Sequence, residues 1–145
     1  MLAHDLEAYL HEQIPASKLL SIGVSTCSSD EVELIAPLSV NLNHKSTAFG
    51  GSLSVIAILA GWSLVYMRIR SIRNEIVIQD SHMSYLSAVT SDFSARSRYE
   101  PNPQWDRFDK LLHRHGKGRV EIKTDVFCQE KLVAVHIGTY VAFKK

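Results

Sequence analysis

An uncharged stretch of twenty residues, Ala48–Met67, limits what this chain can fold into. It reads AFGGSLSVIAILAGWSLVYM, and Arg68 and Arg70 follow at once. By length and apolarity alone such a stretch could span a bilayer. Two adjacent glycines near its start, Gly50 and Gly51, and three serines within it are more typical of a buried core helix.

The segments on both sides of this stretch alternate polar with apolar residues, as strands do when one face needs covering. We expect strands over residues 17–28, 31–38, 75–89, 92–100, 119–128 and 132–143, and short helices over 2–13 and 105–112. The central helix is the only long element apolar enough all round to cover every strand. The pattern therefore predicts one α+β domain over residues 1–145, with an antiparallel sheet curled around a helix. Its exposed edge strands predict a homo-oligomer.

Composition excludes several classes of protein. Sixteen basic and fifteen acidic residues leave a net charge of +1, which argues against a general nucleic-acid binder. Cys27 and Cys128 lack metal-ligand spacing, and His113 and His115 have no third ligand nearby, so we expect no metal site. The N-terminus has acids and histidines where a signal peptide would be basic and then apolar, which favours a cytoplasmic protein.

The segment NLNHKSTAFGGSLSVIAILAGW and the element order resemble the hotdog-fold acyl-CoA thioesterase superfamily. Within it the chain is most similar to the thioesterase domain of the YiiD C-terminal type, which also occurs at the C-terminus of certain GNAT-type acetyltransferases. The strand text DSHMSYLSAVTSDF is similar to the family's segment after the helix. The residues that carry the resemblance are Asn41, Asn43, Thr47, Phe49, Gly51, Ser52, Gly61 and Trp62.

The resemblance implies a sheet wrapped around the helix, a dimer built on the strand after the helix, and a site at the subunit boundary near the helix N-terminus. It implies an acyl-CoA or acyl-carrier-protein thioester as substrate, with coenzyme A entering only as part of that substrate and no separate cofactor. One departure is that the helical carboxylate of the phenylacetate-type branch is replaced here by Ile58. Dehydratase motifs are also absent, which favours hydrolysis.

Thioester hydrolysis needs a group that polarises the carbonyl and a way to aim water at its carbon. The backbone N–H groups of Gly50, Gly51 and Ser52 are expected at a helix N-terminus, where unpaired donors and the dipole favour an oxyanion. Asn41 or Asn43 could orient the water, although loop and helix-cap roles explain both asparagines equally well.

An amide cannot act as a general base at neutral pH, so the base must come from another residue. The candidates are Asp92, His82, His44 and Asp80, from this subunit or from its partner. Arg96 and Arg98 are one of three basic clusters that could meet coenzyme A phosphates, the others being Arg68, Arg70 and Arg73, and His113, Arg114, Lys117 and Arg119.

The sequence thus predicts a homo-oligomeric thioesterase with Gly51 at the oxyanion site and Asn43 positioning water. A second hypothesis is an acyl-CoA-binding module without turnover, because the helical carboxylate is missing. A third, a membrane-anchored protein, would need detergent.

Overall fold

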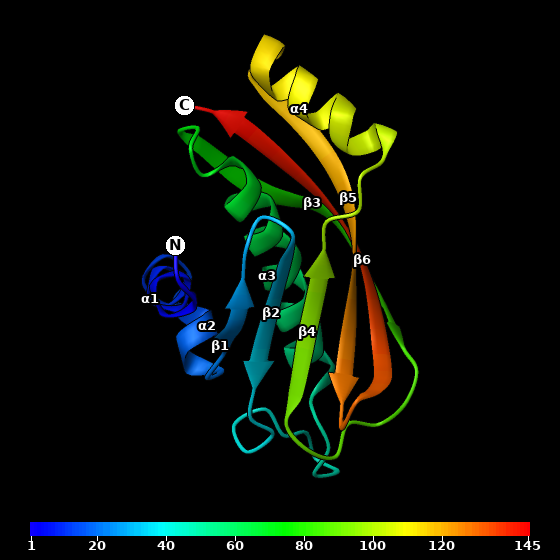
Figure 1. Ribbon diagram of the computed structural model, residues 1–145. Helices are drawn as coiled ribbons and strands as arrows, with labels where there is room; N and C mark the ends of the chain where they lie inside the picture. The colour runs from blue at the N-terminus through cyan, green and yellow to red at the C-terminus, as the bar shows by residue number, and fades with distance from the viewer.

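The computed structural model describes residues 1–145 and contains a single antiparallel sheet wrapped around one long helix (Figure 1). The strand order is β1-β2-β4-β5-β6-β3, and every neighbouring pair is antiparallel. The predicted α+β architecture, an antiparallel sheet curled around one helix, is confirmed. The elements are α1 (Ala3–Gln13), α2 (Pro15–Leu19), β1 (Gly23–Cys27), β2 (Glu31–Ala36), α3 (Gly50–Ile69), β3 (Asn74–Tyr85), β4 (Phe93–Arg98), α4 (Pro103–His115), β5 (Lys117–Cys128) and β6 (Lys131–Lys144).

The predicted central helix is α3, and it supplies the middle of the hydrophobic core. Ile56, Ala57, Ala60, Leu64 and Val65 are completely buried. By length and composition α3 is the one helix that could cross a membrane, yet 67% of its most apolar 18-residue stretch is buried inside the protein. This packing is that of a core helix.

Two glycines let α3 approach the sheet closely around Tyr140 of β6. A Cβ at Gly61 would lie 2.3 Å from the Tyr140 hydroxyl, and one at Gly138 would lie 2.9 Å from its ring. The buried hydroxyl donates to the carbonyl of Ile58 at 2.8 Å, so its hydrogen-bonding need is met inside the core.

The N-terminal region differs from the sequence expectation. The strand predicted from Ser17 begins only at Gly23, and residues 17–19 belong to the short helix α2. Pro15 ends α1, as expected, but it also occupies the first turn of α2, where its missing N–H costs nothing and its fixed φ suits a helix.

The long strand β3 ends at Tyr85 rather than at Val89, and a bulge changes which of its residues share a face. Its register against β6 shifts between Ile78 and Asp80, so Gln79 is the extra residue. Strict alternation predicted Asp80 on the same face as Ile78. The bulge instead puts Ile78, Ser81, Met83 and Tyr85 on the face toward α3, with Asp80 and His82 on the opposite face.

One edge of β3 is free, because the strand lies at the end of the sheet and pairs only with β6. Large apolar side chains around the Tyr85 end of β3 and the start of α3 are also exposed. We call them the apolar rim: Val40, Leu42, Phe49, Tyr85 and Leu86.

Candidate active site at the start of α3

The first turn of α3 presents two backbone donors without a protein acceptor. The extended residue Phe49 precedes the helix, and its own N–H donates to the carbonyl of Asn41 at 2.7 Å. The Ser52 N–H, predicted to be free, donates to Phe49 O at 2.9 Å. No acceptor bonds the N–H groups of Gly50 and Gly51. These two are the donors that remain for an oxyanion.

Two aromatic side chains flank these donors. The Tyr85 hydroxyl donates to Gly50 O at 2.9 Å. The Phe49 ring folds over Gly51 so closely that a Cβ there would lie 2.4 Å from it. Phe49 and Tyr85 are 56% and 54% exposed, so the helix start opens to the surface of the protomer. A side chain at position 51 would therefore displace the exposed Phe49 ring from the helix start.

Asn41 is buried and holds the loop before α3 in place. Its Nδ2 donates to the carbonyls of Leu20 at 3.0 Å and Pro37 at 2.8 Å. Its Oδ1 is buried without a hydrogen-bond partner. The side chain therefore has one unused acceptor, and the contacts observed are those of a structural residue.

Asn43 is occupied by its own loop. Its Oδ1 accepts from the N–H groups of Lys45 at 2.8 Å and Thr47 at 3.1 Å, and its Nδ2 donates to Thr47 Oγ1 at 2.8 Å. These bonds form the side-chain turn that short polar residues make in loops. To position water, Asn43 must give up one of these hydrogen bonds and bond the water molecule in its place.

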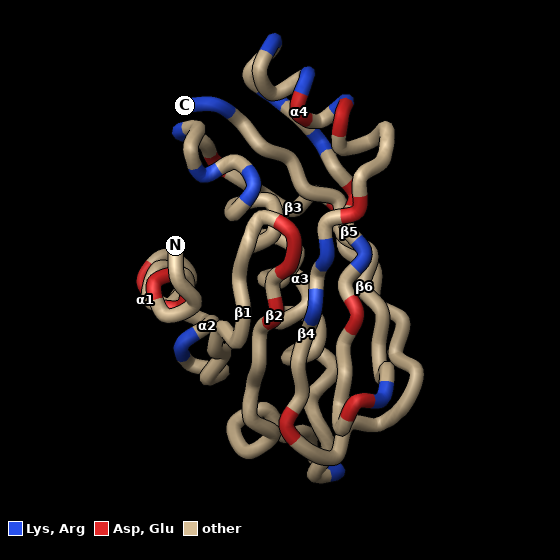
Figure 2. Tube along the Cα trace, viewed as in Figure 1, with Lys and Arg blue, Asp and Glu red and all other residues tan.

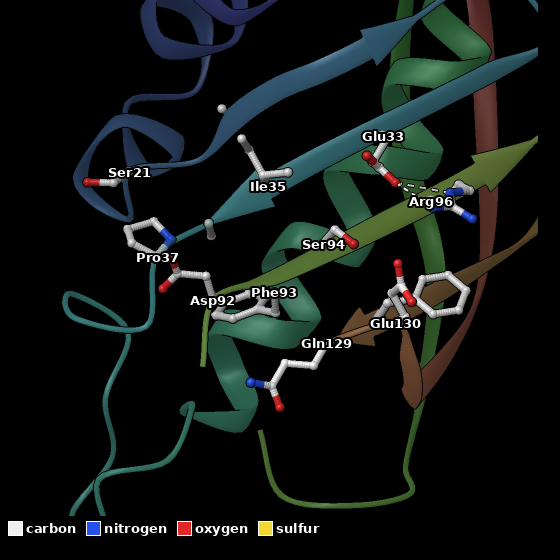
Figure 3. A pocket seen from close by; sticks show the side chains of 13 residues that line it. Ser21, Glu33, Ile35, Pro37, Asp92, Phe93, Ser94, Arg96, Gln129 and Glu130 are labelled. Carbon is white, nitrogen blue, oxygen red and sulfur yellow. Dashed lines mark hydrogen bonds and ion pairs between the residues drawn. The ribbon is translucent and has the colours of Figure 1, made fainter. Parts of the chain in front are cut away.

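Asp92 makes no hydrogen bond with the first turn of α3. It is exposed, and its Oδ1 accepts from the Leu38 N–H at 2.8 Å. It borders an open groove of about 760 Å³, whose lining includes no residue from the first turn of α3. Figure 3 shows Ser94 between Asp92 and the Glu33–Arg96 pair along this groove.

The arginines predicted to meet phosphate are partly neutralised by acids on β2. Arg96 bonds Glu33 through two nitrogens, at 3.0 and 2.8 Å, and lies 3.4 Å from Glu31. The hydrogen bond to Glu33 raises the pKa of Arg96. Arg98 Nε lies 3.5 Å from Glu31. A phosphate would have to compete with these carboxylates.

His82 and Asp80 lie on the face of β3 turned away from α3, so they do not meet Gly51 within this subunit. His82 Nε2 lies 3.5 Å from Ser84 Oγ. His44 is exposed in the loop before α3. No group of three or more His, Cys, Asp or Glu side chains is arranged to hold a metal ion.

Sequence reasoning missed a polar pair between β3 and β6, of which His136 is buried. His136 of β6 is completely buried, and its Nε2 lies 2.8 Å from Ser81 Oγ. Burial, followed by the nearby His82, lowers the pKa of His136. Its Nδ1 has no partner. The available signal was a lone ionisable residue in the apolar run LVAVHIGTYVAF.

Comparison with known proteins supports one family. The model of the family described as "Putative thioesterase (yiiD_Cterm)" matches residues 3–144. A Shewanella oneidensis structure described as a "putative thioesterase" is 30% identical, with a TM-score of 0.87 over 97% of this chain and 96% of that one. The Chlorobaculum tepidum protein OLEI01261, of unknown function, is 25% identical, with a TM-score of 0.91 over 99% and 94%.

More distant structures share the fold alone. Thioesterase HI1161 from Haemophilus influenzae superposes with a TM-score of 0.79 over 99% of this chain and 92% of that one, at 17% identity. The sheet wrapped around α3 is therefore the hotdog fold.

Proposed function

The chain belongs to this thioesterase family, and on that premise we propose that it hydrolyses an acyl thioester carried by coenzyme A or by an acyl carrier protein. The observation that carries the proposal is the pair of unpaired N–H donors at Gly50 and Gly51. They lie at the positive end of the α3 dipole, where negative charge is stabilised.

In this mechanism the thioester carbonyl oxygen faces the two N–H groups. Water attacks the carbonyl carbon, and the charge that develops on oxygen is stabilised by donors already in place. The C–S bond then breaks to release the thiol and the carboxylic acid. The apolar acyl chain lies against the exposed rings of Phe49 and Tyr85.

The base that takes the proton from water comes from the partner subunit. Within one protomer, Asp92 makes no hydrogen bond with the start of α3, and Asp80 and His82 lie on the face of β3 turned away from it. The free edge of β3 and the apolar rim support a homodimer that joins two such strands and covers the exposed apolar side chains. A second copy would bring new side chains to the helix start.

The non-catalytic acyl-CoA-binding module remains the alternative. It is favoured by the hydrogen bonds that occupy Asn43 and by the absence of a carboxylate among the groups that contact the first turn of α3. This hypothesis predicts acyl-CoA binding without thiol release.

Thiol release by the parent and by Gly51→Ala tests the oxyanion assignment. The added methyl group would displace the exposed Phe49 ring, which is proposed to lie beside the acyl thioester at the two N–H donors, and we expect kcat to fall at least about tenfold. Ser54→Ala, one turn further along α3, is the matched control and should keep the parent rate. Equal rates in all three proteins would contradict the assignment.

Asn43→Ala and Asn43→Asp separate the two roles of that residue. If Asn43 positions water, both variants lose kcat while their free energies of unfolding differ. If it only holds the loop, the aspartate variant keeps Oδ1 as acceptor for the Lys45 and Thr47 N–H groups and retains activity.

Asp92→Ala should abolish turnover only if Asp92 is the base.

A further inference from the structure

Positive charge is concentrated at one end of the molecule. Residues 70–75, 103–121 and 143–145 contain nine of the sixteen basic residues but only four of the fifteen acidic ones. The rest of the chain has seven basic and eleven acidic residues, so a net charge of +1 conceals two oppositely charged parts. Figure 2 shows the blue segments around α4 and the C-terminus. We call these three segments the basic end.

The three segments are neighbours in space. The Lys145 N–H donates to Arg73 O at 3.0 Å, which joins the C-terminus to the turn between α3 and β3. The Lys144 N–H donates to Gly116 O at 2.8 Å, and this bond joins the C-terminus to the end of α4. The basic end is therefore one continuous surface.

Most of this charge is available to a partner. The nine basic residues are all exposed, and the only ion pair among them joins Lys145 to Glu75 at 3.0 Å. Lys144 Nζ donates to the His113 carbonyl, which leaves its charge uncompensated. In contrast, Arg96 and Arg98 both pair with carboxylates on β2.

Helix α4 presents part of this charge as a straight stripe. Arg107, Lys110 and Arg114 follow the i, i+3, i+7 spacing, which places them along one face over about 10 Å. The opposite face is anchored by the buried side chains of Trp105, Phe108 and Leu112.

The helix backbone also lies directly on β5. A Cβ at Gly118 would be 2.8 Å from Phe108 O, so this contact depends on the missing side chain. Packing against β5 therefore holds the helix that carries the stripe in place. Less conformational entropy is then lost when a partner binds.

The arrangement of the basic residues favours a protein as binding partner over a nucleotide. A nucleotide phosphate is held by cationic groups that converge on one pocket. The cavity at this end, of about 470 Å³, includes Arg107 and Arg119, but Asp80 and Glu121 line it too. The remaining basic groups are spread over α4, the turn before β3 and the C-terminus (Figure 2), and this spread suits an acidic protein surface.

The position of β3 connects this surface with the proposed active site. The strand starts beside the basic end at Asn74 and finishes at Tyr85, which contacts Gly50. In a dimer that pairs two β3 edges antiparallel, the basic end of one subunit lies toward the start of α3 in the other. A carrier bound to one subunit would then hold its thioester near the oxyanion donors of the other.

We propose that the basic end docks an acidic acyl carrier protein, a small protein that presents its acyl group as a thioester on a flexible prosthetic arm. The inference rests on the proposed hydrolysis and names the carrier. Coenzyme A thioesters would then also be substrates, but they would bind without any contact between a carrier protein and the basic end.

The test compares one acyl group on two carriers. Thiol release is measured for an acyl carrier protein thioester and for the coenzyme A thioester with the parent and with Arg107→Glu/Lys110→Glu. We expect KM for the protein substrate to rise at least about tenfold, with kcat and the coenzyme A kinetics unchanged, because charge reversal at a docking surface mainly slows association. Lys18→Glu/Lys131→Glu, two exposed lysines outside the basic end, is the matched control and should match the parent.

Two outcomes would overturn the docking proposal. One is an equal loss with both carriers, which would mean that Arg107 and Lys110 bind a group common to both. The other is binding of a DNA duplex as tight as binding of the carrier protein, which would indicate a general polyanion site.

A failure of catalysis is distinguished by a binding measurement. If neither thioester is hydrolysed, the proposed function fails, whereas the docking proposal is decided by fluorescence anisotropy of the labelled carrier protein. Binding should weaken about tenfold in Arg107→Glu/Lys110→Glu and as salt rises from 50 to about 200 mM. Unchanged binding in the variant rejects the docking proposal.

Discussion

Tyr140 shows how single residues fix the distance between α3 and the sheet. Its ring fills the space that Gly61 and Gly138 leave free, and its hydroxyl is satisfied by Ile58 O. Gly61→Ala should lower the free energy of unfolding by about 1–3 kcal/mol, because the new methyl group forces the ring aside. Urea denaturation measures this loss.

A second substitution tests whether the Tyr140 hydroxyl causes the loss of stability in Gly61→Ala. Tyr140→Phe removes the atom nearest the added methyl group and should itself cost about 0.5–1.5 kcal/mol through the lost hydrogen bond. Gly61→Ala should then be less damaging in the Tyr140→Phe background than in the parent. Strict additivity of the two losses would show that the hydroxyl is not the obstacle.

His136 predicts how stability depends on pH. Its pKa is lowered in the folded state by burial, so the unfolded chain binds more protons below the ordinary value of 6.5. The contribution of this residue is complete above pH 6.5 and is lost as the pH falls toward the folded-state pKa. Urea midpoints measured between pH 7.5 and about 5 should decrease.

The comparison variant is His136→Gln, which keeps a polar side chain but cannot titrate. Its midpoint should change less over the same pH range. If parent and variant lose stability in parallel, other groups, and not His136, cause the acid sensitivity.

At the scale of elements, the bulge in β3 makes a prediction about deletions. Removing Gln79, the extra residue, restores a regular strand and leaves Met83 and Tyr85 facing α3. Removing His82 instead turns both side chains to the opposite face, because successive residues alternate in a strand. The His82 deletion should cost at least about 2 kcal/mol more than the Gln79 deletion. Denaturation curves compare them directly, and equal losses would contradict the bulge assignment.

The sequence predicts elements better than it predicts their contacts. The apolar run from Ala48 to Met67 and the alternating segments were sufficient to predict the central helix, the six strands and the wrapped sheet. Helix α2 was missed because Pro15 both ends one helix and starts another. The faces of β3 were wrong because a one-residue bulge leaves no periodic signal.

The site is predictable only in part, for a similar reason. The glycines at the helix start could be read from the chain, whereas the use of Ser52 N–H by Phe49 O depends on how the first turn closes. The Ser81–His136 pair joins residues 55 positions apart. Such a contact follows from the register of β3 against β6, which local spacing does not encode.

For the whole molecule, the free β3 edge and the apolar rim predict a dimer. Leu86 is 57% exposed, and Leu86→Lys would place a charge in an interface that needs apolar contact. We expect this variant to sediment as a monomer at concentrations where the parent is a dimer. Leu19→Lys, at an 80% exposed position on α2, should leave the parent's association unchanged. A parent that stays monomeric at high concentration contradicts the interface and the partner-supplied base.

The central claim is that this molecule turns over acyl thioesters. The most direct measurement is thiol release from short, medium, long and aromatic acyl-CoAs, followed to many turnovers per protomer and paired with calorimetric binding of the same compounds. We expect sustained release with at least one of them. Binding without release beyond a single turnover would contradict it and leave a non-catalytic acyl-CoA-binding module.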